Sequence, residues 1–103
     1  MNFGLSDKTI SAIHSVFSKY PQITKAIVYG SRAMGNYKNG SDIDLTLYGS
    51  KLSNQILMDI LDDLDELLLP YKIDLSIYAA INNEKLQDHI NRVGIDFYVT
   101  SHA

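Results

Sequence analysis

One stretch constrains the fold of this chain more than any other, the segment 30–45, which reads GSRAMGNYKNGSDIDL. Apolar residues fill positions 26–29 before it, and apolar residues alternate with polar ones from 42 to 48. This pattern is typical of a strand, a glycine-rich turn and a second strand. A strand that ends in Gly30-Ser31 and leads into a short helical turn presents free backbone N–H groups, which suit a phosphate.

Two aspartates follow this turn, Asp42 and Asp44, at positions i and i+2 of the second expected strand. Residues with this spacing point to the same face of a strand. Aspartate is disfavoured in strands, and two like charges side by side repel unless a cation lies between them. A hard divalent ion such as Mg²⁺ would relieve this repulsion, with phosphate oxygens and water completing its shell. The segment therefore predicts a metal site beside a phosphate site, a combination suited to nucleotide chemistry.

The rest of the chain predicts a single α+β domain over residues 1–103, as expected for this length. Ser6 and Ser53 are candidate N-caps of two helices that end near Pro21 and Pro70. A third strand is expected at 72–78, and a last helix from the cap residue Asn82 to a stop at Gly94. Residues 96–99 form either a short strand or an ordered tail. The order helix, strand, strand, helix, strand, helix gives a small mixed β-sheet flanked by helices.

A third aspartate, Asp74, lies on the polar face of the third expected strand. If the second and third strands are neighbours, its carboxylate converges with those of Asp42 and Asp44. Three carboxylates would meet the needs of a two-metal phosphoryl or nucleotidyl transfer, with Asp74 on the ion nearer the acceptor and able to take its proton. The alternative is that Asp74 is a solvated residue at the sheet edge.

Other polar residues have competing interpretations. Ser31 would offer a hydroxyl and an N–H to phosphates, or be a simple turn serine. Arg32 would pair with phosphate or with the leaving pyrophosphate, or be a surface cation. The acidic run within 59–66 is interpreted as the solvated face of the second helix, opposite an apolar stripe that runs on to Leu68. None of the histidines shows metal-binding spacing, so none is a site candidate; they are His14, His89 and His102.

Composition argues against several classes of function. The net charge is −3 and no Lys/Arg run is present, which speaks against binding long nucleic acid. Cysteine is absent, which excludes disulfides and Cys-ligated zinc. No signal peptide or membrane span is visible, so we expect a cytoplasmic protein. Gly35 is not followed by the Lys-Ser/Thr of a Walker A loop, and the turn does not supply the G-x-G-x-x-G of a dinucleotide fold.

At these residues the chain resembles a known family. Gly30-Ser31, ten residues, Asp42-Ile43-Asp44 and a later strand aspartate, Asp74, are similar to the motif of the nucleotidyltransferase superfamily that includes polymerase β. The fuller string GSRAMG…SDIDL resembles its minimal branch, the MNT-like proteins. The resemblance implies that Gly30 and Ser31 hold nucleotide phosphates. It also implies that the three aspartates hold two Mg²⁺ ions, or Mn²⁺ in their place.

The same resemblance implies a partner and a reaction. Minimal nucleotidyltransferases are commonly paired with a HEPN-domain protein in a toxin–antitoxin system, so a hetero-oligomer is expected and a homodimer is possible. The expected activity is transfer of a nucleoside monophosphate to a hydroxyl, such as that of a tyrosine of the HEPN toxin. The expected donor is ATP, which would give AMP, or another NTP. Two alternatives stay open at this point. The chain could inhibit a HEPN ribonuclease by binding alone, or it could modify a small molecule.

Overall fold

The computed structural model describes residues 2–100 and contains four α-helices, four strands and a short 3₁₀ turn in that part of the chain. The first half comprises α1 (Asp7–Phe17), β1 (Lys25–Tyr29), α2 (Ser31–Met34) and β2 (Ile43–Tyr48). The second half comprises α3 (Asn54–Asp65), β3 (Ile73–Ile77), η1 (Tyr78–Ala80), α4 (Glu84–Val93) and β4 (Ile95–Val99). The expected α+β class is confirmed.

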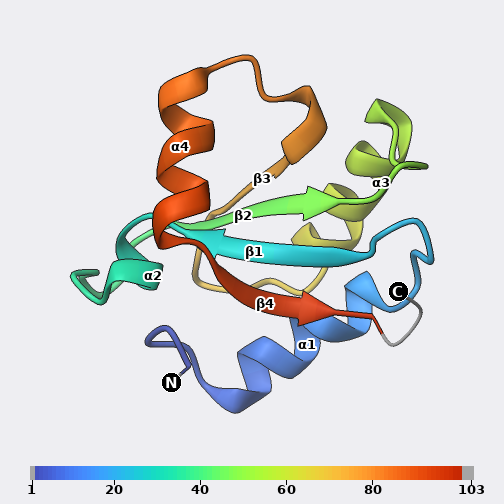
Figure 1. Ribbon diagram of the computed structural model, residues 1–103. Helices are drawn as coiled ribbons and strands as arrows, with labels where there is room; N and C mark the ends of the chain where they lie inside the picture. Colours follow the sequence, from blue (N-terminus) through green and yellow to red (C-terminus); the bar gives the residue numbers. More distant parts are fainter. Residues whose placement is uncertain (1, 101–103) are drawn as a thin grey trace.

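The four strands form one mixed sheet in the order β3-β2-β1-β4 (Figure 1). β1 pairs antiparallel with both β2 and β4, whereas β2 and β3 run parallel. The parallel pair requires a crossover, and α3 supplies it. The expectation that the second and third strands are neighbours is therefore confirmed. The segment 96–99 is a strand and not a tail, because β4 pairs along the free edge of β1.

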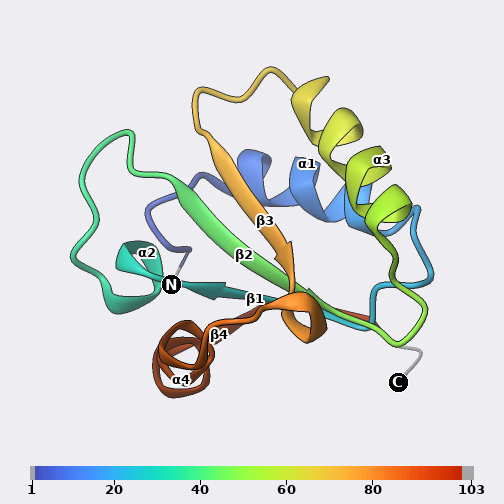
Figure 2. The ribbon, with the colours of Figure 1, turned by 90° about the horizontal axis from the view of Figure 1, so that it is seen from above.

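Helices cover the two faces of the sheet unequally. Viewed along the sheet, α1 and α3 lie on one side and α4 on the other (Figure 2). The larger core lies under α1 and α3, where the alternating residues Ile43, Leu45 and Leu47 of β2 are fully buried. A smaller cluster lies under α4 and is built from Ile27, Tyr29 and Ile90. The face that the sequence predicts to be polar is thus partly covered by α4, and the same face carries Asp44 and Asp74.

The helix caps agree only in part with the sequence pattern. Ser6 and Ser53 accept hydrogen bonds from Thr9 N and Ile56 N and cap α1 and α3 as expected. The cap of α4 is Asn83, one residue later than predicted, and its side chain accepts from Leu86 N. Gly94 follows α4 in an extended conformation (φ −62°, ψ 141°), where no left-handed stop is needed. Its glycine is explained by packing, since a Cβ there would collide with the Ile27 side chain and the Ile90 carbonyl.

Two helices end earlier than their prolines suggest. α1 ends at Phe17 and α3 at Asp65, several residues before Pro21 and Pro70. Leu68 was expected on the buried stripe of the second helix, and this is wrong. It lies beyond α3 with φ 54° and an exposed fraction of 87%. A proline disfavours helical geometry in the residue before it and has no N–H to donate to the helix, so it limits how far a helix can extend without fixing where it ends.

Candidate functional site

The Gly30-Ser31 turn lies at the end of β1, where the chain enters α2 (Figure 1). Gly30 adopts φ 73° and ψ −152°, a region essentially open only to glycine. A Cβ at this position would also collide with Oδ2 of Asp44. The turn and the Asp44 carboxylate are therefore in direct contact, which requires a residue without a side chain at position 30. The first N–H groups of α2 have no intrahelical acceptor, as at any helix start.

Asp44 and Asp74 lie side by side. They are register partners on the parallel strands β2 and β3, and Tyr29 at the end of β1 is the partner of Asp44 on its other side. Register partners point to the same face of a sheet, here the face of α4. Asp42 directly precedes β2 and lies close enough to influence Asp44 electrostatically. The turn and the three carboxylates expected from the sequence thus lie at one end of the sheet.

The electrostatics of this cluster favour a cation. Burial raises the pKa of Asp44 above its usual value, and the charges of Asp74 and Asp42 raise it further, whereas a positive charge on His89 would lower it. Burial raises the pKa of Tyr29, and the charges of Asp74 and Asp44 raise it further. A hydrogen bond with Ser76 has the opposite effect and lowers this pKa. Both shifts have the same main causes, burial and neighbouring carboxylates, so negative charge is concentrated around Asp44.

Comparison with known proteins decides the family. The family model for polymerase β-type nucleotidyltransferases matches residues 11–103. The chain belongs to the polymerase β nucleotidyltransferase family. That match spans the Gly30-Ser31 turn, the aspartates and all four strands of this nucleotidyltransferase. Among curated proteins, none matches its sequence.

Solved structures show the same fold at low sequence identity. A toxin–antitoxin complex with AMP-PNP matches with a TM-score of 0.70 and 19% identity over 94% of this chain and 76% of the other. A tri-AMPylated Shewanella oneidensis HEPN toxin in complex with MNT antitoxin matches with a TM-score of 0.67 and 16% identity over 93% of this chain and 74% of the other. A Sulfolobus solfataricus protein named as a nucleotidyltransferase matches with a TM-score of 0.52 and 18% identity over 97% of this chain and 95% of the other. The resemblance to the minimal nucleotidyltransferases is confirmed at the level of fold.

The donor set fits a hard cation in chemistry, although the side chains do not form a closed cage. Within residues 2–100, no group of three Asp, Glu, His or Cys side chains is arranged to hold one metal ion. Mg²⁺ rarely uses such an all-protein cage, because it binds one or two carboxylates together with substrate phosphates and water. Asp44 and Asp74 provide such a carboxylate pair, with Asp42 at its margin.

Arg32 lies in a different environment from either sequence interpretation. Its side chain is only 2% exposed, so it is not a surface cation. Nε and Nη2 donate to the Ser41 carbonyl at 3.1 and 2.8 Å, and Nη1 donates to the Phe3 carbonyl at 2.9 Å. The guanidinium also lies over the rings of Tyr37 and Tyr71, at 5.2 and 4.9 Å from their centroids. These contacts tie the N-terminal segment to the 36–41 loop. They do not support the predicted phosphate contact, and we leave Arg32 out of the nucleotide site.

One residue of the site is missing from the sequence interpretation. His89 of α4 lies against the turn, and its Nε2 accepts a hydrogen bond from Gly30 N at 3.2 Å. The sequence gives no reason to select it, because no other histidine lies at metal-binding spacing from it. Only the packing of α4 on β1 brings it to the turn, so no local pattern could identify it. His14 lies elsewhere, on α1, where its Nε2 donates to the Phe97 carbonyl at 2.7 Å. His102 lies outside the described residues.

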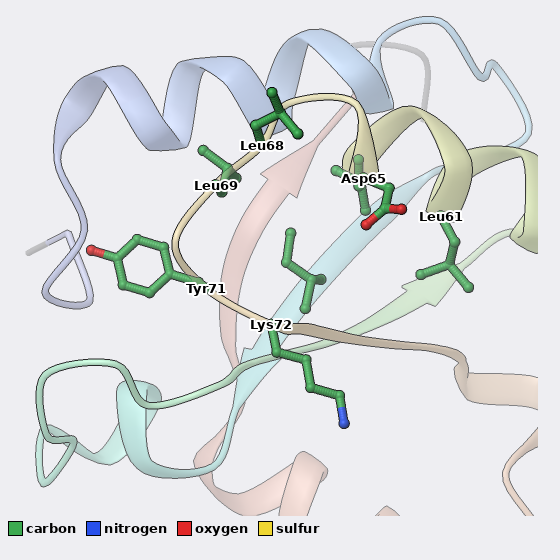
Figure 3. A pocket seen from close by; sticks show the side chains of 8 residues that line it. Leu61, Asp65, Leu68, Leu69, Tyr71 and Lys72 are labelled. Carbon is green, nitrogen blue, oxygen red and sulfur yellow. The ribbon is translucent and has the colours of Figure 1, made fainter.

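Two hollows of about 290 Å³ each lie away from the carboxylates. The first is a groove between the end of α3 and the start of β3 (Figure 3). It is lined by Leu61, Leu64, Asp65, Leu68, Leu69, Tyr71, Lys72 and Ile73. The second lies beside Arg32 and the 36–41 loop. Neither hollow is lined by Asp42, Asp44 or Asp74, so the open end of the sheet remains the candidate site. No helix within residues 2–100 could cross a membrane.

Proposed function

We propose that this nucleotidyltransferase moves a nucleoside monophosphate, AMP from ATP, to a hydroxyl on a partner protein of the HEPN class, and so acts as an antitoxin. The observation that carries the proposal is the contact between the Gly30 turn and Asp44, next to Asp74. Phosphate-binding amides and cation-binding carboxylates then act on one triphosphate. The solved complexes with AMP-PNP and with a tri-AMPylated HEPN toxin supply the nucleotide and the partner class.

Each group has a role in the proposed reaction. Gly30 and Ser31 would hold the terminal phosphates through backbone N–H groups and the serine hydroxyl. The acceptor, which we infer to be a tyrosine hydroxyl, would attack the α-phosphorus and form a new P–O bond. The bond from that phosphorus to the bridging oxygen breaks, and pyrophosphate leaves. The hydroxyl proton would pass to the Asp74 carboxylate.

Asp42, Asp44 and Asp74 would hold Mg²⁺, with two ions in the complete site and Mn²⁺ as a substitute. When bound, the metal would supply positive charge against the triphosphate. The carboxylates would also orient it, because Asp44 is fixed between Tyr29 and Asp74 in the register of the sheet. We place this reaction in the cytoplasm. The protein would act in a complex with the partner, and a homodimer is the alternative assembly.

The test is transfer to a co-expressed HEPN partner. Intact-mass spectrometry after incubation with Mg·ATP should show the partner heavier by AMP, with pyrophosphate released. Calorimetry should show ATP binding with Mg²⁺ or Mn²⁺ and little binding in EDTA. The paired variant Asp62→Asn/Asp65→Asn, on exposed positions of α3, should bind ATP like the wild type. Equal ATP affinity in EDTA would refute the metal-linked site.

A second function, inhibition by binding alone, is favoured by Leu68, which is 87% exposed beside the groove at the end of α3 and offers apolar surface away from Asp42, Asp44 and Asp74. Asp42→Asn/Asp44→Asn distinguishes the two functions. If modification neutralises the toxin, this variant binds the partner but no longer protects cells. If occlusion suffices, it still protects them. A folded double variant that no longer associates would show that docking depends on the carboxylates.

A further inference from the structure

The hydrogen bond between His89 and Gly30 sets the state of the histidine ring. Gly30 N–H is a donor, so the Nε2 atom that it meets at 3.2 Å must carry a lone pair and no hydrogen. The proton of the neutral ring is then on Nδ1. His14 is the opposite case, because its Nε2 meets a carbonyl oxygen and must carry the hydrogen. The two histidines therefore differ in tautomer, and only His89 acts as an acceptor for the turn.

The position of His89 is fixed by the packing of α4. The next residue, Ile90, is 2% exposed and packs against Ile27 and Tyr29 of β1. At the end of the helix, Gly94 approaches Ile27 so closely that any Cβ would collide with it. The His89 ring also meets the Tyr29 ring edge-on, with centroids 6.1 Å apart. The C-terminal half of α4 thus lies against the end of β1, beside the start of α2 (Figure 1).

Gly30, whose amide donates to His89, depends on its neighbours for its conformation. Gly30 has the most conformational freedom of any residue type, and its observed φ of 73° and ψ of −152° is one of many conformations open to it. Its Cα faces the carboxylate of Asp44, with no room for a side chain between them. Rotation of this peptide would move the turn amides relative to Asp44. An acceptor on a rigid helix is a direct way to select one peptide orientation.

We infer that His89 is a positioning residue for the Gly30 turn. Through Nε2 it orients the Gly30 peptide, so that the following amides and the Asp44 carboxylate address the same triphosphate. His89 itself does not touch the nucleotide in this role. The inference rests on the proposed nucleotide site for its functional consequence, whereas the hydrogen bond can be tested without any nucleotide.

The first experiment is NMR on the ligand-free protein. An N–H···N hydrogen bond transmits a scalar coupling between its two nitrogens, so Gly30 N and His89 Nε2 should be coupled in ¹⁵N-labelled protein. The His89 ¹⁵N shifts should show an unprotonated Nε2, and those of His14 a protonated one. Exchange of the Gly30 amide hydrogen should be faster in His89→Leu than in the wild type. A protonated His89 Nε2 in the neutral ring would overturn the inference.

The second experiment is Mg·ATP binding by variants. We expect His89→Leu, which keeps bulk and removes the acceptor, to weaken binding about three- to tenfold, the range of a single hydrogen bond. His89→Gln, whose Oε1 can accept from Gly30, should recover most of this loss. His14→Leu loses one ring hydrogen bond elsewhere and should bind within about twofold of wild type.

The outcomes separate this inference from the proposed function. Wild-type protein that shows the coupling but has no Mg·ATP affinity would refute the nucleotide site and leave the hydrogen bond standing. Wild-type-like binding by His89→Leu, or no recovery in His89→Gln, would overturn the positioning role. Tighter binding by His89→Leu would also overturn it, because His89 would then compete with phosphate for the Gly30 amide.

Discussion

Asp44 on β2 and Asp74 on β3 are direct partners in the parallel register of the two strands, although the whole of α3 lies between them in the chain. Their carboxylates share one sheet face. The residue next to each aspartate is buried on the other face, Ile43 beside Asp44 and Leu75 beside Asp74. The aspartates are therefore held on a backbone that cannot slip by one residue without burying charge. We expect the two side chains to have different roles, Asp44 in holding the metal and triphosphate and Asp74 in accepting the proton of the hydroxyl.

The first prediction concerns Asp74. We expect Asp74→Ala to bind Mg·ATP within about threefold of wild type, because Asp42 and Asp44 remain for the triphosphate. Transfer should fall by at least ~10²–10⁴-fold, the usual loss when a general base is removed. Calorimetry and intact-mass spectrometry of the partner measure the two effects. Wild-type-like modification would show that another group accepts the proton.

The second prediction concerns the stability of the metal-free protein. A raised pKa means that folding favours the protonated form of Asp44, so its charge at pH 7 destabilises the fold. Asp44→Asn should therefore raise the melting temperature by a few degrees in EDTA. The matched variant Asp62→Asn, on the exposed face of α3, should not. A lower melting temperature for Asp44→Asn would mean that the carboxylate has an internal partner.

Arg32 provides a third prediction, on stability alone. Replacing it by Met leaves the Phe3 and Ser41 carbonyls without their donor. It also removes the charge that lies over the rings of Tyr37 and Tyr71. We expect the free energy of unfolding to fall by roughly 2–4 kcal/mol, since a buried group left unpaired costs ~1–3 kcal/mol. Arg32→Lys should also be destabilising, because an ammonium cannot reproduce the fork.

Urea unfolding measures this loss, and ATP calorimetry below the melting temperature shows whether Arg32 has a second role. Retained ATP affinity in folded Arg32→Met is the expected result. A large loss of affinity with little loss of stability would return Arg32 to the phosphate site.

The fourth prediction is a pH dependence of stability that arises from Tyr20, which contacts Asp63 of α3. The Tyr20 hydroxyl donates to Asp63 Oδ2 at 2.5 Å, and this hydrogen bond, with some burial, raises the pKa of Tyr20 from 10.0 to about 12. A raised pKa means that the stabilisation is complete below the unfolded value of 10.0 and is lost as pH rises through about 12. The melting temperatures of wild type and Tyr20→Phe should differ below pH 10 and converge toward pH 12.

Absorbance of tyrosinate gives an independent measurement of this shift. Subtracting the titration of Tyr20→Phe from that of the wild type isolates Tyr20, and Asp63→Asn should return its midpoint toward 10. An unshifted Tyr20 in the wild type would contradict the hydrogen bond.

The fifth prediction uses the unusual backbone of Leu68. A leucine with φ 54° and 87% exposure gains little from burial and has an unfavourable backbone conformation. Leu68→Asn or Leu68→Gly should raise the free energy of unfolding by about 1 kcal/mol. Relief of the left-handed backbone conformation, worth roughly 1–2 kcal/mol, exceeds the entropy that a more flexible residue adds to the unfolded chain. Leu64→Ala is the contrasting variant, because Leu64 is 4% exposed, and its loss should cost roughly 2–5 kcal/mol. Destabilisation by Leu68→Gly would show that Leu68 packs against the groove in solution.

Local pattern was sufficient for much of this molecule. The two-residue alternation of β2, the serine caps of α1 and α3 and the glycine turn each depend on neighbours within a few positions. The candidate carboxylates could be predicted for the same reason, because an aspartate on a strand contradicts local preference wherever the strand lies. The spacing of Asp42 and Asp44 alone puts them on one face.

What only the tertiary structure decided depends on contacts between distant segments. Which strand lies beside β2, and hence whether Asp74 meets Asp44, depends on the path of the chain through α3. The burial of Arg32 requires the N-terminal segment and the 36–41 loop to meet around it. The contact of His89 with Gly30 requires α4 to cross the end of β1. No periodicity in sequence encodes these encounters, because they follow from how apolar faces of separate elements are buried together.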